Sequence, residues 1–392
     1  MQGFIGFIAG CDLYIFFPRK TRRAHDEMQR RRDAIPTLSL LLCLLSVARA
    51  FLVPPPHIVA LRATREWADS RGRRPNPSAS RHRGRLLCSA ASAEGIEVKR
   101  VALPTGVDME YCVTHPPAQG SSKPPLVFIH GSFHGAWCWA EAWMPFFAAA
   151  GFSCYAMSLR GTSSTPQLGD AKTVQLTEHV DDLTAFMESV VPAAPGPPVL
   201  IGHSFGGMYA QKVCEQQRLN IGALVLLCSV SPRGSTSTVL RYLFQKPKLA
   251  WEIVRAFVFK EAATDLDVSR RVFFSDTTPS DTKVREYMRH FAADSVVGLD
   301  TRTAPQLFPA KTGAGADGRA NRAWLDALPP TLVVGARRDL VVDGAAVEET
   351  ADFYESELLW VDGPHDCMLD PAARGPSARA VLGWLERHVQ GC

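Results

Sequence analysis

The sequence predicts an α/β protein, with a mostly parallel β-sheet covered by helices on both faces and a helical cap inserted late in the chain. From residue 96, short apolar runs bounded by Gly or Pro alternate with longer amphipathic stretches. This alternation stops over residues 231–327, where the pattern is helical throughout. We therefore expect a core over 96–230 and 328–392, with the cap between its two parts.

The first part of the core is expected to open with a hairpin, because two strand-like runs flank the Thr105-Gly106 turn. Strands are predicted next at 124–130, 152–159, 198–203 and 222–229. Helices are predicted between them at 137–151, 173–191 and 205–217. This order of strand and helix is typical of a parallel sheet with crossover helices.

The cap and the second part of the core follow the same reading. Cap helices are predicted at 239–259, 265–274 and 280–294, and the Gly-rich stretch 311–321 is expected to be a loop. Strands at 331–336 and 356–362 and helices at 344–354 and 373–390 complete the sheet.

The first 95 residues differ in composition from the rest and are expected to be a targeting presequence. They carry 16 Lys/Arg and 7 Asp/Glu, whereas residues 96–392 have a net charge of −5. A basic run at 30–32, an apolar run at 38–47 and the ARA motif at 48–50 are typical of a secretory signal peptide. Because that signal begins near Met28, residues 1–27 are interpreted as an extension of the gene model. An apolar anchor at 1–17 is the alternative.

Residues 51–92 contain eight arginines and two acidic residues, with Ser and Ala enriched, which is typical of an organellar transit peptide. A signal followed by such a segment resembles the bipartite presequence of algae with secondary plastids. Delivery to the plastid is therefore expected; the alternative is a secreted or endomembrane protein with a basic linker.

Composition excludes several classes of binding protein. The acidic body argues against a nucleic-acid partner. The ten cysteines show no metal-binding spacing, so no metal is expected and the thiols are expected to be free or buried. No phosphate-cradling motif is found, so no cofactor is expected.

The stretch Gly202-His203-Ser204-Phe205-Gly206 predicts a nucleophilic serine at a sharp turn between a strand and a helix. Glycines at the flanking positions are expected because side chains there would collide. A serine that only caps the helix is the alternative.

A serine nucleophile needs a general base and a carboxylate that orients it. His365 follows the last predicted strand, and Asp339 follows the strand before it, so both should lie at the carboxyl edge of the sheet. Asp343 is the second choice for the carboxylate, although it is also placed to cap a helix. Asp366 and Asp370 are disfavoured because they are too close to His365 along the chain.

An oxyanion hole is expected from backbone amides. One donor is the Phe205 N–H; the other is the Ser132 N–H as first choice or the Phe133 N–H as second, in the loop His130-Gly131-Ser132-Phe133-His134. His130 is expected to hold this loop by hydrogen bonding. His203 is expected to point to the other side of the turn. His179 and His388 lie within predicted helices and are expected at the surface.

With these motifs in place, residues 96–390 resemble the α/β-hydrolase superfamily. The resemblance rests on VFIHGSFHGAWCW, SLRGTSS, VLIGHSFGG, VVGARRDLVVD and PHDCMLD. The HGSFHGAWCW loop is similar to that of plant methylesterases and hydroxynitrile lyases. Ser158 departs from the superfamily, which often has an acidic residue there.

The resemblance implies an α/β-hydrolase fold and a serine esterase with the triad Ser204, His365 and Asp339. The expected substrate is a small-molecule apolar ester, such as a medium-chain acyl, lipid or pigment ester, since cap aromatics are available to line an acyl pocket. These aromatics are Phe244, Trp251, Phe257, Phe259, Phe273, Phe274 and Phe291. Peripheral lipid contact through the cap is a further expectation, and the oligomeric state stays open. The alternatives are a lyase or perhydrolase that uses the same triad, or a ligand receptor with little turnover. The cap lysines, Lys246, Lys248, Lys260 and Lys283, do not decide for a lyase.

Overall fold

The computed structural model describes most of the chain beyond residue 94, all of it within one compact unit, Val47–Cys392. The described residues are 95–117, 121–169, 171–300, 307–309, 322–389 and 391. The expected presequence (all but its last residue) and the expected loop at 311–321 lie outside them. No helix among these residues is long and apolar enough to cross a membrane.

Eight strands form one sheet in the order β1-β2-β4-β3-β6-β7-β9-β10. The expected hairpin is β1 (Glu97–Ala102) with β2 (Asp108–Thr114), and β2 also runs antiparallel to β4 (Cys154–Met157). All other pairs in this sheet are parallel, which confirms the mostly parallel prediction. The remaining strands are β3 (Leu126–Ile129), β6 (Val199–His203), β7 (Ala223–Leu227), β9 (Thr331–Ala336) and β10 (Glu357–Val361).

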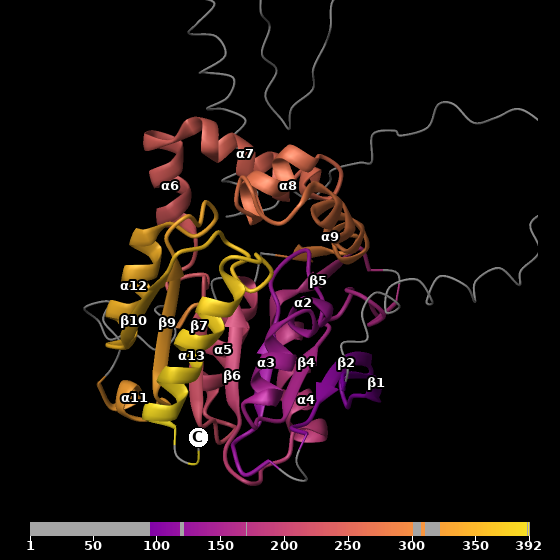
Figure 1. Cartoon of the computed structure of the whole chain (residues 1–392), viewed down its shortest axis with the longest axis vertical. Helices are drawn as coiled ribbons and strands as arrows, with labels where there is room; N and C mark the ends of the chain where they lie inside the picture. The colour runs from indigo at the N-terminus through magenta and orange to yellow at the C-terminus, as the bar shows by residue number, and fades with distance from the viewer. Residues whose placement is uncertain are drawn as a thin grey trace, which may run out of the picture. The chain divides into compact units, whose positions relative to one another are not determined.

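Helices cover both faces of this sheet, because successive strand residues point into two separate apolar cores. In β3, Leu126 and Phe128 belong to one core and Val127 and Ile129 to the other. The first core includes α2 (Trp137–Ala140), α3 (Trp143–Ala149) and α13 (Arg374–His388), and the second includes α4 (Leu176–Val190), α5 (Phe205–Gln216) and α12 (Gly344–Tyr354). In Figure 1, α3 and α13 lie in front of the strands. The doubly covered α/β architecture is confirmed.

From residue 231 to 294 the chain forms helices, which we name the inserted helices. They are α6 (Thr236–Gln245), α7 (Pro247–Phe257), the 3₁₀ helix η3 (Glu261–Ala263), α8 (Leu266–Phe273) and α9 (Asp281–Asp294). Figure 1 shows α6 to α9 gathered beyond one end of the strands. Phe133, on the loop that follows β3, packs against Phe257 and Phe273 with ring centroids 5.5 and 6.0 Å apart. The inserted helices therefore contact the carboxyl edge of the sheet.

Three predicted helices differ from the observed ones. The helix expected over 137–151 is two helices, since Ala142 leaves the helical conformation with φ −149°. The helix expected over 239–259 breaks at Lys246, because Pro247 starts a new helix and cannot donate to the preceding turn. The stretch expected to be helical from 173 begins as a strand.

That strand, β5 (Thr173–Gln175), pairs in parallel with the unpredicted β8 (Gly298–Asp300) as a separate two-stranded sheet. A short helix, α11 (Arg322–Asp326), precedes β9. The β5–β8 pair joins the segment before α4 to the segment after α9, so it ties the inserted helices to the core at a second place.

Candidate active site

Ser204 lies at a strained turn between β6 and α5. Its backbone has φ +53° and ψ −121°, a region that residues with side chains rarely adopt. A Cβ on Gly202 would lie 2.5 Å from the Gly207 Cα, and a Cβ on Gly206 would collide with the Ile129 carbonyl. The glycines of G-x-S-x-G are therefore required by close backbone approach, as predicted from the motif.

His365 and Asp339 lie together at the carboxyl edge of the sheet. The His365 Nδ1 is 2.8 Å from the Asp339 Oδ2, and both side chains are buried. The other oxygen of Asp339 accepts hydrogen bonds from the backbone N–H groups of Val341 and Val342, at 2.7 and 2.9 Å. The carboxylate is thus fixed in a position where it orients the imidazole with Nδ1 as the donor and Nε2 free.

The surroundings of His365 favour its charged form. Burial alone would lower the pKa of His365, but the charge of Asp339 and its hydrogen bond outweigh burial, with a smaller contribution from Asp366. The pKa of His365 is therefore raised above 6.5. An imidazole that gains a proton during a reaction is stabilised by the same two carboxylates.

Ser204 is connected to this pair through its neighbour His203 and not by a hydrogen bond of its own. Among the described residues, none joins the Ser204 hydroxyl to the His365 ring. The residue before the serine, His203, places its ring centroid 4.7 Å from that of His365. A Cβ on Gly131 would lie 2.8 Å from the Ser204 Cβ, so the loop after β3 also contacts the serine.

Asp343, the second choice for the carboxylate, and Asp370, which was disfavoured, have other partners. Asp343 caps α12 by accepting from the Ala346 N–H, and it pairs with Arg241 at 2.6 Å. Asp370 accepts from the backbone of the turn that precedes α13 and from the Thr278 hydroxyl. The structure thus places Asp339, and neither of these two, against His365.

The predicted oxyanion loop follows β3. Its Phe133 has φ +69°, and Ser132, Phe133 and Phe205 all line one cavity. In the part of the chain that the structure describes, the amides of these three residues donate to no protein group. His130 holds the loop as expected, because its Nε2 accepts from the Leu159 N–H at 2.9 Å while its Nδ1 lies 2.8 Å from the Gly131 carbonyl.

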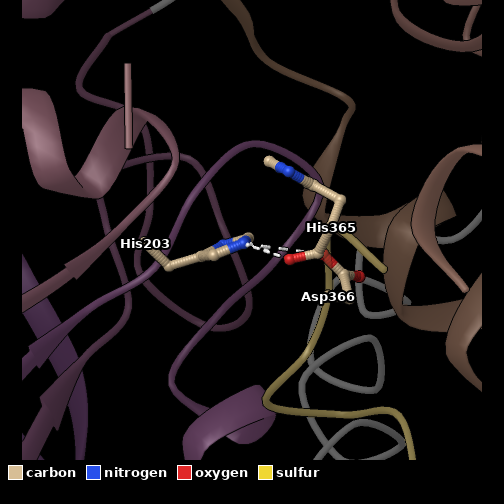
Figure 2. A group of neighbouring side chains, drawn as sticks. All are labelled: His203, His365 and Asp366. Atoms are coloured by element: carbon tan, nitrogen blue, oxygen red, sulfur yellow. Dashed lines mark hydrogen bonds and ion pairs between the residues drawn. The ribbon is translucent and has the colours of Figure 1, made fainter. Parts of the chain in front are cut away.

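Three residues near the site received no role from the sequence, or the wrong one. His134 and Asp366 lie 2.9 Å apart through Nε2 and Oδ2 and are both buried. His203 was expected to point away from the base, but its Nε2 lies 3.1 Å from the His365 carbonyl, as Figure 2 shows. The sequence signal for the first two was present: a second histidine in HGSFHG and an acid directly after His365.

A cavity of about 300 Å³ lies beside the oxyanion loop. Its walls are mostly apolar and come from the core and from the inserted helices; they include Leu159, Val174, Tyr209, Phe257, Val258, Val297 and Leu299. Ser204 and His365 are not among its lining residues, so the cavity begins next to the serine, at Phe205. Of the cap aromatics expected for a pocket, Phe257 lines it, whereas Phe273, Phe274 and Phe291 are buried in the apolar core.

The cavity also has polar groups in its walls. His179, expected at the surface, is 2% exposed and lines the cavity; burial lowers its pKa to about 3, so it is neutral. Asp294 accepts from the Trp137 indole N–H and the Ser163 backbone N–H, and burial raises its pKa to about 6. Lys260 lines the cavity too and donates to the Ser295 carbonyl.

Two trios of buried side chains bring their N, O or S atoms within 4.8 Å of one another, and both include His365. One adds His203 and Asp366, the other Cys228 and Asp339. Hydrogen bonds within the protein already use the His203 Nε2 and both oxygens of Asp339. A hydrogen bond with the Cys367 thiol and burial raise the pKa of Cys228 well above 9, so it remains a thiol. The six cysteines that the structure describes are buried, as expected.

Comparisons with known proteins agree with this architecture. A family model described as the alpha/beta hydrolase family matches residues 126–374. The chain is 32% identical over 134 residues to Methylesterase 1 of Arabidopsis thaliana, covering 33% of this chain and 49% of that protein. It is 29% identical over 123 residues to Methyl jasmonate esterase 1 of Vitis vinifera, covering 31% and 46%. The chain therefore spans less than half the length of these curated relatives.

Solved structures share the fold. An esterase from Exiguobacterium antarcticum superposes with a TM-score of 0.54 at 14% identity, over 74% of this chain and all of the other. At that identity the likeness concerns the fold alone.

Proposed function

Because the chain belongs to the α/β-hydrolase family, we propose that it is a serine hydrolase that cleaves a small carboxylic ester, with Ser204, His365 and Asp339 as its triad. The single observation that carries this proposal is the buried 2.8 Å hydrogen bond between His365 Nδ1 and Asp339 Oδ2, beside a serine held in a strained turn. That arrangement has the parts that activate a hydroxyl as a nucleophile.

The proposed reaction has two halves. The Ser204 Oγ attacks the ester carbonyl while the His365 Nε2 accepts its proton, and Asp339 stabilises the imidazolium that forms. The imidazolium then gives the proton to the departing alcohol and leaves an acyl group on Ser204. Water, deprotonated by the same imidazole, releases the acid and restores the serine.

The negative charge on the tetrahedral intermediate needs amide donors. We assign this role to the Phe205 N–H, at the start of α5, and to the Ser132 or Phe133 N–H of the loop after β3. The N-terminal end of α5 adds a favourable helix dipole at the same place. The absence of protein partners for these amides, among the described residues, supports the assignment.

The proposed substrate is a small, largely apolar ester. A cavity of about 300 Å³ with mostly apolar walls accommodates a compact acyl or alcohol group. The names of the two curated relatives, a methylesterase and a methyl jasmonate esterase, support an ester as the substrate. We propose that the inserted helices act as the cap that selects this group, since Phe257 and Val258 come from that segment.

Labelling of the serine tests the proposal. A fluorophosphonate probe should label the wild-type protein, and Ser204→Ala should abolish labelling and lower ester turnover by at least about three orders of magnitude. A series of p-nitrophenyl esters of rising chain length then measures the size of the pocket. Labelling that persists in Ser204→Ala would show that the nucleophile lies elsewhere.

A second candidate function, cyanohydrin cleavage by the same triad, is favoured by Lys260. An ammonium group in the cavity wall would stabilise a departing cyanide. Burial lowers the pKa of Lys260, and its Nζ donates to the Ser295 carbonyl inside the protein. This alternative would be favoured if the wild-type protein released cyanide from mandelonitrile, if Lys260→Met did not, and if the wild type hydrolysed none of the esters tested.

Two further proposals concern location. We propose plastid delivery through residues 1–95. Fusion of that segment to a fluorescent protein tests this proposal, and secretion of the fusion would contradict it.

We also propose peripheral lipid contact through the inserted helices, where Phe244 and Phe259 are 76% and 53% exposed. Co-sedimentation with phospholipid vesicles should fall in Phe244→Ser if this contact forms.

A further inference from the structure

His134 forms hydrogen bonds in two directions between the loop after β3 and the loop after β10. Its Nδ1 lies 2.7 Å from the Ser132 carbonyl, and its Nε2 lies 2.9 Å from the Asp366 Oδ2. The side chains of His134 and Asp366 are 1% and 0% exposed. The bond therefore joins the loop that carries the proposed oxyanion donors to the loop that carries the proposed base.

The chemistry of this pair makes it tolerable in the interior. A carbonyl only accepts hydrogen bonds, so the Nδ1 of His134 carries a proton. The Nε2 faces the Asp366 Oδ2 at hydrogen-bond distance, so each of these two buried atoms has a partner, which avoids the cost of leaving a buried polar atom unpaired.

The turn that holds Ser204 is tied to the same loop. The His203 Nε2 lies 3.1 Å from the His365 carbonyl and 3.8 Å from the Asp366 Oδ1 (Figure 2). Burial, with the nearby His365 and His134, lowers the pKa of His203 well below 6.5, so its ring is neutral. A neutral ring that faces a carbonyl through Nε2 donates from that atom, and this bond fixes the backbone of His365.

We propose that Asp366 and His134 are positioning residues, which hold the base loop and the oxyanion loop at a fixed separation around Ser204. This inference rests on the proposed function. The bond to the Ser132 carbonyl fixes the plane of the peptide between Ser132 and Phe133, and that plane sets the direction of the Phe133 amide. Neither side chain lines the cavity, so both act through the groups they hold.

Substitutions of Asp366 separate positioning from folding. Asp366→Ala removes the link, and kcat for a p-nitrophenyl ester should fall roughly 10- to 100-fold, while KM changes less than about threefold. Asp366→Asn keeps a neutral hydrogen bond from its amide to the His134 Nε2 and should recover most of kcat. Asp370→Ala is the matched control: it removes another fully buried carboxylate of the same loop, and kcat should stay within about twofold of wild type.

His134→Asn provides an independent route if Asp366→Ala does not fold. The introduced amide nitrogen takes the place of Nδ1 at the Ser132 carbonyl, but the asparagine side chain is too short to reach Asp366. The variant should lose as much kcat as Asp366→Ala. The double variant, His134→Asn with Asp366→Ala, should lose no more than either single one, because the two residues act as one unit.

The outcomes separate this inference from the proposed function. If a fluorophosphonate does not label Ser204 in the wild-type protein, the proposed function fails and the positioning role fails with it. If the wild type is labelled and Asp366→Ala or His134→Asn reacts at the wild-type rate, the positioning role alone is wrong. Additive losses in the double variant, or an equal loss of kcat in Asp370→Ala, would also overturn it.

Discussion

The loops at the carboxyl edge of the sheet and the inserted helices build the same site with different forces. The loops are held by polar contacts of fixed geometry, such as His365 to Asp339 at 2.8 Å and the Leu159 N–H to His130 at 2.9 Å. The inserted helices pack on the core with aromatic rings, as Phe257 and Phe273 do around Phe133, beside polar contacts such as that of Asp294 with Trp137. Hydrogen bonds demand direction and distance, whereas ring packing mainly demands volume.

This difference suggests a division of labour. Groups that must be placed to within a fraction of an ångström lie on short loops anchored by strands. The walls of the cavity, which decide which substrate fits, come in part from the inserted helices. Their ring packing tolerates substitutions that change the shape of a side chain. Substitutions in the loops should therefore affect kcat, and substitutions in the inserted helices should change selectivity.

The largest expected effect is that of Asp339→Asn. The amide cannot hold the imidazole with Nδ1 as the donor, so kcat should fall by about 10³- to 10⁴-fold. In the wild type the base must be neutral, and its pKa is raised above 6.5, so kcat/KM should rise with pH through a midpoint above 6.5. The residual activity of the variant should show that midpoint at lower pH. Steady-state kinetics from pH 5 to 9 measure both.

Asp343→Asn is the control for this substitution, since Asp343 caps α12 and lies apart from His365. It should leave kcat nearly unchanged, and because Asn caps a helix about as well as Asp, the free energy of unfolding should fall only through the lost charge opposite Arg241, by roughly 0.2–1 kcal/mol. If Asp343→Asn reduced kcat as much as Asp339→Asn, the orienting carboxylate would be wrongly assigned.

A smaller effect, on selectivity, is expected from Phe257→Ala. Removal of this ring enlarges the cavity, so kcat/KM for a longer p-nitrophenyl ester should rise about tenfold relative to the acetate. Phe244→Ala, in the same segment but 76% exposed, should leave the ratio unchanged. An unchanged ratio in Phe257→Ala would place the acyl group outside this cavity.

The same contrast explains what the sequence could predict. Ser204, Asp339 and His365 each follow a strand that has a clear apolar pattern, and parallel strands bring their carboxyl ends together, so their neighbourhood could be inferred. The break at Pro247 had a local signal, the proline itself, which the prediction of one continuous helix passed over. The β5–β8 pair, in contrast, depends on a contact between segments far apart in the chain. Local pattern holds no information on such contacts.

Histidines show the limit most clearly. His179 was expected at the surface of a predicted helix, yet its ring is buried against Tyr209, with ring centroids 5.1 Å apart. His203 was expected to point away from the base. Its contact with the His365 carbonyl depends on how the turn after β6 packs against the loop after β10, which the local sequence does not reveal. A residue type with both polar and apolar character gives a weak signal of burial.

The smallest effect concerns pH-dependent stability at the contact between the two regions. Asp294 ends α9 and accepts hydrogen bonds from Trp137 and from the Ser163 backbone, both in the core. Burial raises its pKa from 3.8 to about 6, so between these values the folded protein binds more protons than the unfolded chain. Its contribution to stability is therefore complete below pH 3.8 and is lost as pH rises through about 6.

Asp294→Asn removes this titration. Between pH 4 and 7 the free energy of unfolding of the wild type should fall relative to that of the variant by up to about 3 kcal/mol, as a shift of about two pKa units implies. Urea unfolding at several pH values measures the difference between the two proteins. If the free energy of unfolding of Asp294→Asn changed with pH in the same way as that of the wild type, the Asp294 carboxylate would be as well solvated in the folded protein as in the unfolded chain. The contact between the inserted helices and the core would then be insensitive to pH.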